Sequence, residues 1–321
     1  MKVNYVIGMG SGILKVNRTV GEIMNRLYQI WQVKHNKWPT NTTDKSHLEF
    51  ILTNFDPTSE EQIALVAELC YIVKSGEWQM SYEALKNMLP DKQFEMNILE
   101  EVKDYFTGKE YFGDQKSFDE YIKNQRNPFI LELLSHIMLL SIENTLACKP
   151  YEFSIQGVHY MHLNSKKQGL DLAAIAKDNL KNEYYLIIGE SKNRQSPSEG
   201  TKEALEAFKT FDSGRKWPDI RQVMKAVANS FEKPTDRISE KISKHILWQK
   251  KIIYRLTIEH RSKKPRGGSQ FRDFKVHTPN ATCEQFRQCE AIHTERLDYF
   301  YDAVSIKVTN YIEEKEKEIY V

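Results

Sequence analysis

The chain has 321 residues, of which 40% are hydrophobic and 28% are charged, and its formal net charge at pH 7 is only +2. This composition excludes a disordered protein, and the near-neutral total means that any nucleic-acid-binding surface must be a local basic patch. Four scattered cysteines do not suggest a disulfide framework, and neither a secretory signal nor an apolar run of about 18 residues is visible. We therefore expect a cytoplasmic protein without a membrane-spanning segment.

The N-terminal third of the chain is predicted to be mainly helical. Residues 1–16 suggest two short strands joined by the glycine turn GMGSG, whose spacing lacks the third glycine of a dinucleotide-binding loop. Apolar side chains then recur at helical spacing in residues 18–35 and 57–76. We expect residues 1–124 to form an N-terminal domain that binds a partner or regulates the rest of the chain.

The most apolar helix candidate, NPFILELLSHIMLLSIENTLAC, begins at Asn127 after a predicted break in regular structure. Asn127 fits a helix cap, and Pro128 fits the first helical position. Three polar residues share one stripe of this helix, because successive residues are about 100° apart. These residues are Glu132, His136 and Glu143. The stripe either faces solvent or contributes to a metal site.

The next element, GLDLAAIAKDNLKNEYYLIIGESKNR, is typical of a β-hairpin with charged residues at one end. The side-chain period of two puts Glu190 and Lys192 on one face of the second strand, and the turn brings Asp171 back beside them. Two carboxylates can bind Mg²⁺ or Mn²⁺, while a lysine can hold or deprotonate an attacking water. The pattern predicts metal-assisted phosphodiester hydrolysis, with Asp171, Glu190 and Lys192 as catalytic residues.

An acidic helix, then Asp171, then Glu190-Ser191-Lys192 on the next strand resembles the PD-(D/E)xK nuclease superfamily. Leu170 stands in place of the proline before the aspartate, which many members of the superfamily also lack. This resemblance implies a restriction-endonuclease-like α/β fold, a mixed central sheet flanked by helices. We expect it in residues 125–321, beside the mainly helical N-terminal domain.

A more specific resemblance, to one family within this superfamily, comes from the order of four segments. They are FILELLSHIML, QGLDLAAI, YYLIIGESKNR and TKEALEAFKTF. Over about residues 127–230 the chain is similar to the HamA family, the nuclease subunit of the Hachiman anti-phage defence system. The resemblance implies a DNA nuclease controlled by a partner helicase. It also implies that Glu132, Asp171 and Glu190 bind the metal.

Two alternatives remain open at this point. A non-catalytic subunit could keep the nuclease fold and act by docking DNA or a helicase, in which case the three carboxylates need not meet at one point. A type II restriction endonuclease would carry nearly the same motif, and it predicts discrete DNA fragments and a neighbouring methyltransferase gene.

A basic stretch follows the hairpin and its helix. Residues 241–275 hold eleven Lys or Arg against two Asp or Glu, with aromatic residues between them. Such a stretch is either a solvated charge run or a surface that follows the phosphates of DNA. Next to a nuclease centre we favour DNA contact, and the candidate residues are Lys250, Lys251, Arg261, Lys263, Lys264 and Arg266.

Overall fold

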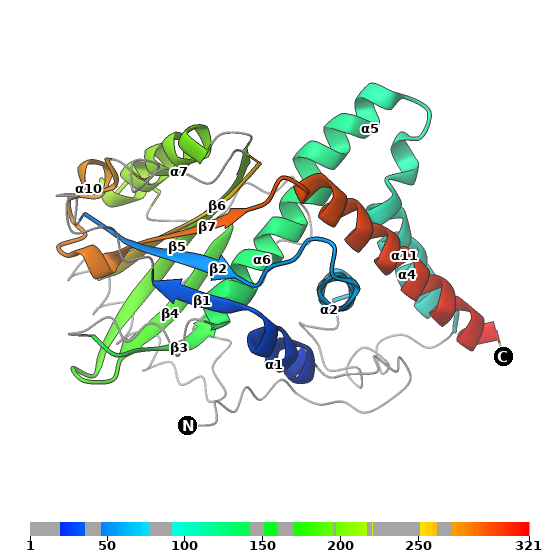
Figure 1. Cartoon of the computed structure of the whole chain (residues 1–321), viewed down its shortest axis with the longest axis horizontal. Coiled ribbons are helices and arrows are strands. Elements are labelled where there is room, and N and C mark those ends of the chain that lie inside the picture. The colour runs from blue at the N-terminus through cyan, green and yellow to red at the C-terminus, as the bar shows by residue number, and fades with distance from the viewer. Residues whose placement is uncertain are drawn as a thin grey trace.

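A computed structural model describes residues 20–35, 46–76, 92–141, 151–158, 170–194, 197–216, 220, 251–261, 271 and 273–320. These residues form an α/β structure in which helices pack against both faces of a seven-stranded mixed sheet (Figure 1). The α/β class expected from the sequence is therefore confirmed. Within the described ranges, none of the helices is both long enough and apolar enough to cross a membrane.

The sheet has a parallel centre and antiparallel edges. Its strand order is β1–β2–β7–β6–β5–β4–β3, and the four strands β2, β7, β6 and β5 run parallel to one another. Every residue of β6 is buried, as expected for a central parallel strand covered on both faces. The strands are β1 (Gln32–His35), β2 (Leu48–Thr53), β3 (Phe153–Val158), β4 (Leu172–Asp178), β5 (Glu183–Arg194), β6 (Ile252–His260) and β7 (Arg287–His293).

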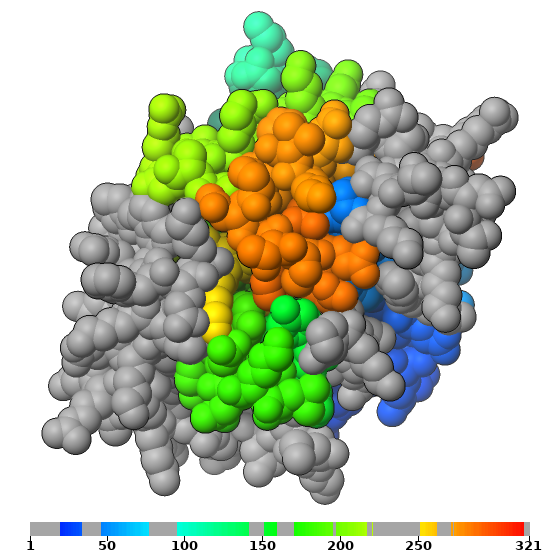
Figure 2. Space-filling model, turned by 90° about the vertical axis from the view of Figure 1, so that its left-hand side faces the viewer, coloured from blue at the N-terminus to red at the C-terminus, as the bar shows by residue number. Residues whose placement is uncertain are grey.

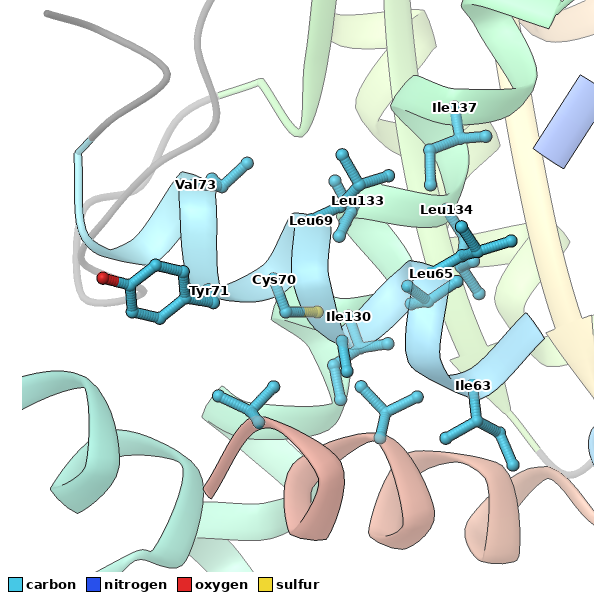
Figure 3. Close-up of a cluster of buried hydrophobic side chains, with 14 of the residues drawn as sticks. Ile63, Leu65, Leu69, Cys70, Tyr71, Val73, Ile130, Leu133, Leu134 and Ile137 are labelled. Atoms are coloured by element: carbon cyan, nitrogen blue, oxygen red, sulfur yellow. The ribbon is translucent and has the colours of Figure 1, made fainter. Parts of the chain in front are cut away.

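Helices from both ends of the chain cover the sheet. Helix α7 packs on β5 and β6 from one side, and α6 packs on β4 and β5 from the other (Figure 1). Apolar side chains of α2, α6 and α11 meet in a buried cluster that includes Leu69, Leu133 and Leu134 (Figure 3). The helices are α1 (Val20–Ile30), α2 (Glu60–Lys74), α4 (Lys92–Thr107), α5 (Gln115–Tyr121), α6 (Asn127–Ser141), α7 (Pro197–Asp212), α10 (Phe274–His277) and α11 (Leu297–Tyr320).

This buried cluster draws on distant parts of the chain. It extends from Ile23 of α1 to Ile312 of α11 and includes residues of α2, α4 and α6. Strands β1 and β2 also belong to the same sheet as β3 to β7. Segments on both sides of the predicted boundary after residue 124 therefore share one sheet and one core.

The helix predicted over residues 18–35 is wrong in its last five residues. Helix α1 ends at Ile30, and the next residues form β1, which pairs with β2. The reason is non-local, because β2 pairs in parallel with β7 more than 200 residues further along, and such pairing overrides a local helical period. The helix predicted at residues 57–76 is confirmed as α2, while the hairpin predicted at residues 1–16 lies outside the described residues.

The break predicted before Pro128 is also wrong. Helix α5 continues through a π-helical turn, Ile122–Arg126, directly into α6, and Asn127 has helical torsion angles rather than those of a cap. A wider π turn tolerates proline in a continuous helix, because proline lacks the N–H that the regular hydrogen-bond ladder uses. The Asn127 side chain instead accepts a hydrogen bond from Arg126 Nε at 3.0 Å.

Residues 273–286, in the connection from β6 to β7, close one end of the sheet. Figure 2 shows this segment in orange between α7, in yellow-green, and the β4–β5 hairpin, in green. Its Phe274 stacks on Phe208 of α7 with ring centroids 5.7 Å apart, and its Phe286 packs against Tyr185 of β5 at 5.2 Å. The opposite end of β5 carries the charged residues that the sequence singled out.

Candidate active site

Strands β4 and β5 form the predicted hairpin, in a continuous antiparallel register from Leu172↔Gly189 to Asp178↔Glu183. Because β4 begins at Leu172, the residues of β5 beyond Gly189 have, among the described strands, a neighbour only on the β6 side. Asp171 precedes this last pair and so lies beside the free edge of β5. The local pattern of two apolar runs and a polar turn thus brings all three predicted catalytic residues to one end of the hairpin.

Gly189 is required by the close approach of the two strands. A Cβ atom on this residue would lie only 2.7 Å from Cβ of Leu172. We expect Gly189→Ala to lower the free energy of unfolding by about 1–3 kcal/mol, the usual cost of overpacking a well-packed region. Urea denaturation measures this, with Gly113→Ala as the control, since a Cβ there meets nothing within 4 Å. Equal stability of the two variants would contradict the prediction.

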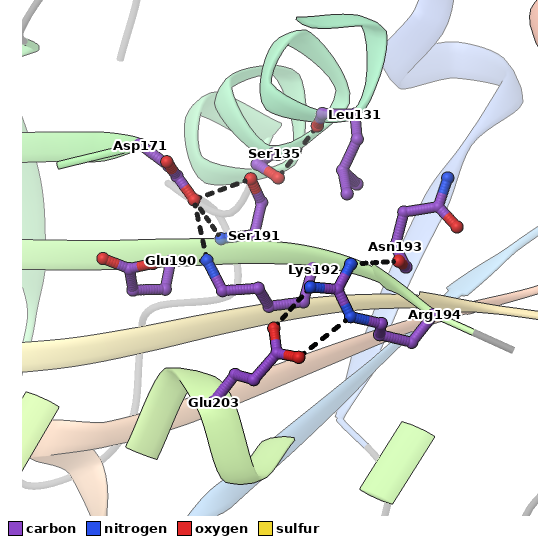
Figure 4. Close-up of polar contacts among 9 residues, drawn as sticks. All are labelled: Leu131, Ser135, Asp171, Glu190, Ser191, Lys192, Asn193, Arg194 and Glu203. Carbon is purple, nitrogen blue, oxygen red and sulfur yellow. Dashed lines mark hydrogen bonds and ion pairs between the residues drawn. The ribbon is translucent and has the colours of Figure 1, made fainter. Parts of the chain in front are cut away.

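Lys192 joins the two carboxylates of the site. Its Nζ lies 2.6 Å from Oε2 of Glu190 and 3.6 Å from Oδ2 of Asp171 (Figure 4). The Glu190 side chain is only 9% exposed, whereas those of Lys192 and Asp171 are 21% and 30% exposed. The convergence predicted from strand alternation is confirmed, and the site opens to solvent on the Asp171 side.

The charges of the site shift each other's titration. Burial and the neighbouring Asp171 carboxylate raise the pKa of Glu190 to about 7, against the opposing effect of Lys192. Burial lowers the pKa of Lys192, but Glu190 and Asp171 outweigh it, so the net pKa of this ammonium lies above its ordinary value. Lys192 is therefore a cation at neutral pH, which suits it to bind and orient anions or water rather than to accept a proton.

Helix α7 covers the Lys192 face of β5. A Cβ on Gly200, in the first turn of α7, would lie 3.0 Å from Cβ of Lys192, so the helix and strand are in direct contact. Glu203, one turn later, accepts a hydrogen bond from Nε of Arg194 at 3.2 Å (Figure 4). This ion pair keeps the Arg194 guanidinium beside Lys192 at the end of the strand.

Ser191 is a site residue that the sequence did not single out. Its backbone N–H donates to Oδ2 of Asp171 at 2.9 Å, and its hydroxyl donates to the same oxygen at 3.2 Å. Strand alternation turns Ser191 away from the face that carries Glu190 and Lys192, so the sequence contains no signal for this contact. Ser191 can donate both hydrogen bonds because the Asp171 carboxylate lies at the edge of β5 rather than on either face of the sheet.

Glu132 is not brought together with the other predicted metal ligands. Among the residues of known position, no three His, Cys, Asp or Glu side chains form a group that could hold a metal ion. Glu132 lies instead towards α4, where its charge is among the influences that raise the pKa of the buried Tyr105, after burial itself. Ser135 of α6 lies beside Ser191, with its hydroxyl on the Leu131 carbonyl (Figure 4).

The rotation of α6 about its own axis explains why the sequence assigned Glu132 to the metal site. Helix α6 is buried nearly all round, so its polar stripe did not reveal which side would face β5. His136 lies on the same stripe, with Nδ1 2.8 Å from the carbonyl oxygen of Glu132, and Glu143 is outside the described residues.

Two of the six predicted DNA-binding residues can be located, and they lie at opposite ends of β6. Lys251 precedes the strand and pairs with Glu183 at 2.6 Å, at the end remote from the site. Arg261 follows the strand at the site end and donates to Asp298 at 2.8 Å and to Asn193 at 2.9 Å. The other four candidates, Lys250, Lys263, Lys264 and Arg266, lie outside the described residues.

No protein-family model matches this sequence, and no curated protein matches it. The assignment of a function therefore depends on the chemistry of the residues around Lys192.

Proposed function

We propose that this protein is a metal-dependent endonuclease that hydrolyses phosphodiester bonds in DNA, with a restriction-endonuclease-like fold. The observation that carries the proposal is the contact of one half-buried lysine with two carboxylates, Lys192 with Glu190 and Asp171, at the open end of a hairpin. The chain order of α6, β4, β5 and α7 supports it, because the PD-(D/E)xK resemblance requires an acidic helix, an aspartate and then a strand with Glu-x-Lys.

The two carboxylates fit a divalent cation. Proteins commonly bind Mg²⁺ through one or two carboxylates, with waters and substrate phosphate oxygens as the remaining ligands. The pKa of Glu190 is raised because its carboxylate is buried and lies near the Asp171 carboxylate. A bound divalent cation would stabilise both negative charges. Asp171 and Glu190 would hold Mg²⁺ or Mn²⁺, and the predicted third ligand, Glu132, is not needed for this number of protein ligands.

Each residue then has a separate role in cleavage. When bound, the metal would supply Lewis acidity at the phosphate and an activated water. The Lys192 ammonium orients the nucleophilic water and stabilises the negative charge that develops on the phosphate. Burial by α7 restricts water around Lys192, and a lower local dielectric strengthens both effects.

The similarity to the HamA family extends the proposal to the biological role. We place the protein in the cytoplasm as the nuclease of an anti-phage defence system, directed or held in check by a partner helicase. Arg261, at the site end of β6, would contact the DNA backbone.

The test is cleavage of linear and supercoiled DNA with Mg²⁺, with Mn²⁺ and with EDTA, for the protein alone and with any helicase encoded beside it. We expect metal-dependent cleavage by the wild type and its loss in the Glu190→Ala/Lys192→Ala double variant. The matched control is Lys103→Ala/Glu316→Ala, which removes an ion pair between α4 and α11. Cleavage that survives in the first variant would show that the chemistry lies elsewhere.

A second candidate function is a non-catalytic subunit that docks DNA or a helicase. The observation that favours it is the position of Glu132, which leaves two rather than three of the predicted carboxylates together among the described residues. This candidate predicts DNA binding that is independent of divalent metal, with no cleavage of either substrate under any condition.

A further inference from the structure

We infer that Ser191, the middle residue of the Glu-Ser-Lys motif, is a positioning residue that holds the Asp171 carboxylate for metal binding. This inference rests on the proposed function. Both donors of Ser191, the backbone N–H and the hydroxyl, reach the same oxygen of Asp171, at 2.9 Å and 3.2 Å (Figure 4). No other residue supplies two hydrogen bonds to a predicted catalytic side chain in the part of the chain with known structure.

The backbone donor is available because β4 begins only at Leu172 and does not extend opposite Ser191. Leu186 N–H donates towards β6, to the carbonyl of Lys251. Successive N–H groups of a strand alternate in direction, so the N–H of Ser191 is directed to the β4 side. The last β4 partner on that side is Leu172, opposite Gly189. The Asp171 carboxylate takes the place of the missing strand and satisfies this donor.

The Ser191 hydroxyl adds a second hydrogen bond that fixes the orientation of the Asp171 carboxylate. A single N–H fixes the distance to Oδ2 but lets the carboxylate rotate, whereas a second donor from another direction fixes its orientation. The Lys192 contact falls on the same oxygen. Within the described residues, Oδ1 of Asp171 therefore has no hydrogen-bond donor and can serve as a ligand. Groups that orient a ligating carboxylate typically change metal affinity about 10–100-fold when removed.

The decisive comparison is Ser191→Thr against Ser191→Val, since these side chains have the same shape and differ in the hydroxyl. Mn²⁺ binding without DNA, followed by electron paramagnetic resonance, gives a readout that does not depend on catalysis. We expect Ser191→Val and Ser191→Ala to weaken Mn²⁺ binding by roughly tenfold and to raise the Mg²⁺ concentration for half-maximal cleavage by a similar factor. Ser191→Thr should restore both to within about threefold of wild type.

Ser135→Ala is the matched control. This buried serine of α6 lies beside Ser191, but its hydroxyl donates to the Leu131 carbonyl at 3.0 Å (Figure 4). It should bind Mn²⁺ like the wild type. Suppose that the wild type binds metal and cleaves DNA, and that Ser191→Val and Ser191→Thr have the same Mn²⁺ affinity and the same Mg²⁺ requirement. The inference is then overturned and the proposed function stands. If the wild type neither binds Mn²⁺ nor cleaves, both are overturned.

Discussion

Lys192→Met should abolish DNA cleavage and, in the absence of DNA, tighten the binding of Mn²⁺. The ammonium lies 2.6 Å from Glu190 and 3.6 Å from Asp171, so it occupies the region that a divalent cation would share. Methionine keeps most of the side-chain volume and removes the charge. We expect cleavage to fall by at least about 100-fold, which is typical when one group that stabilises transition-state charge is lost.

The opposite sign of the binding effect makes this prediction specific. Removing about 1.4 kcal/mol of repulsion between two nearby cations strengthens binding roughly tenfold. Titration with Mn²⁺ and a cleavage assay on the same preparations measure both quantities. Lys209→Met is the control, because Lys209 pairs with Glu206 on the exposed side of α7. Weaker Mn²⁺ binding by Lys192→Met would mean that the cation site does not lie between the two carboxylates.

The part of the site that the sequence predicts is the part that local geometry determines. The hairpin follows from two apolar runs around a polar turn, and the period of two then puts Glu190 and Lys192 side by side. Asp171 joins them because antiparallel strands return to the same end. None of these steps needs knowledge of the rest of the fold, and the contacts to Lys192 agree with them.

The errors arise where distant segments decide the outcome. Strands β1 and β2 depend on pairing with β7, which no local period shows. The placement of Glu132 depends on the rotation of α6 about its own axis, and a helix buried nearly all round gives little indication of it. The contact of Ser191 with Asp171 depends on where β4 begins, one residue after Asp171.

Glu259→Gln should stabilise the protein, and increasingly so as the pH rises. Glu259 lies near the end of β6 with no exposed surface, and within the described residues neither carboxylate oxygen has a hydrogen-bond partner. Burial raises its pKa from the usual 4.5 to about 8, with Arg261 opposing the shift and Asp298 adding to it. The folded state therefore retains a proton that the unfolded chain releases above pH 4.5.

The sign of the pH dependence follows from this difference. Below pH 4.5 the carboxyl group is neutral in both the folded and the unfolded state, so its ionisation does not yet lower the free energy of unfolding. Between pH 4.5 and about 8 the folded state binds more protons, so stability falls by up to about 1.4 kcal/mol per pH unit. Above about pH 8 the loss levels off. Glutamine resembles the protonated form and does not titrate, so the variant avoids the loss.

Urea denaturation of both proteins at each pH from 5 to about 9 tests this, since the difference in unfolding free energy isolates Glu259 from all other titrating groups. We expect the difference to grow across this range to a few kcal/mol, with Glu120→Gln on the exposed side of α5 showing no such growth. A constant difference would show that Glu259 titrates normally. Glu259 lies opposite Asn193 of β5, the residue after Lys192, and Asn193 accepts a hydrogen bond from Arg261. Ionisation of Glu259 at high pH therefore destabilises the sheet directly beside the candidate active site.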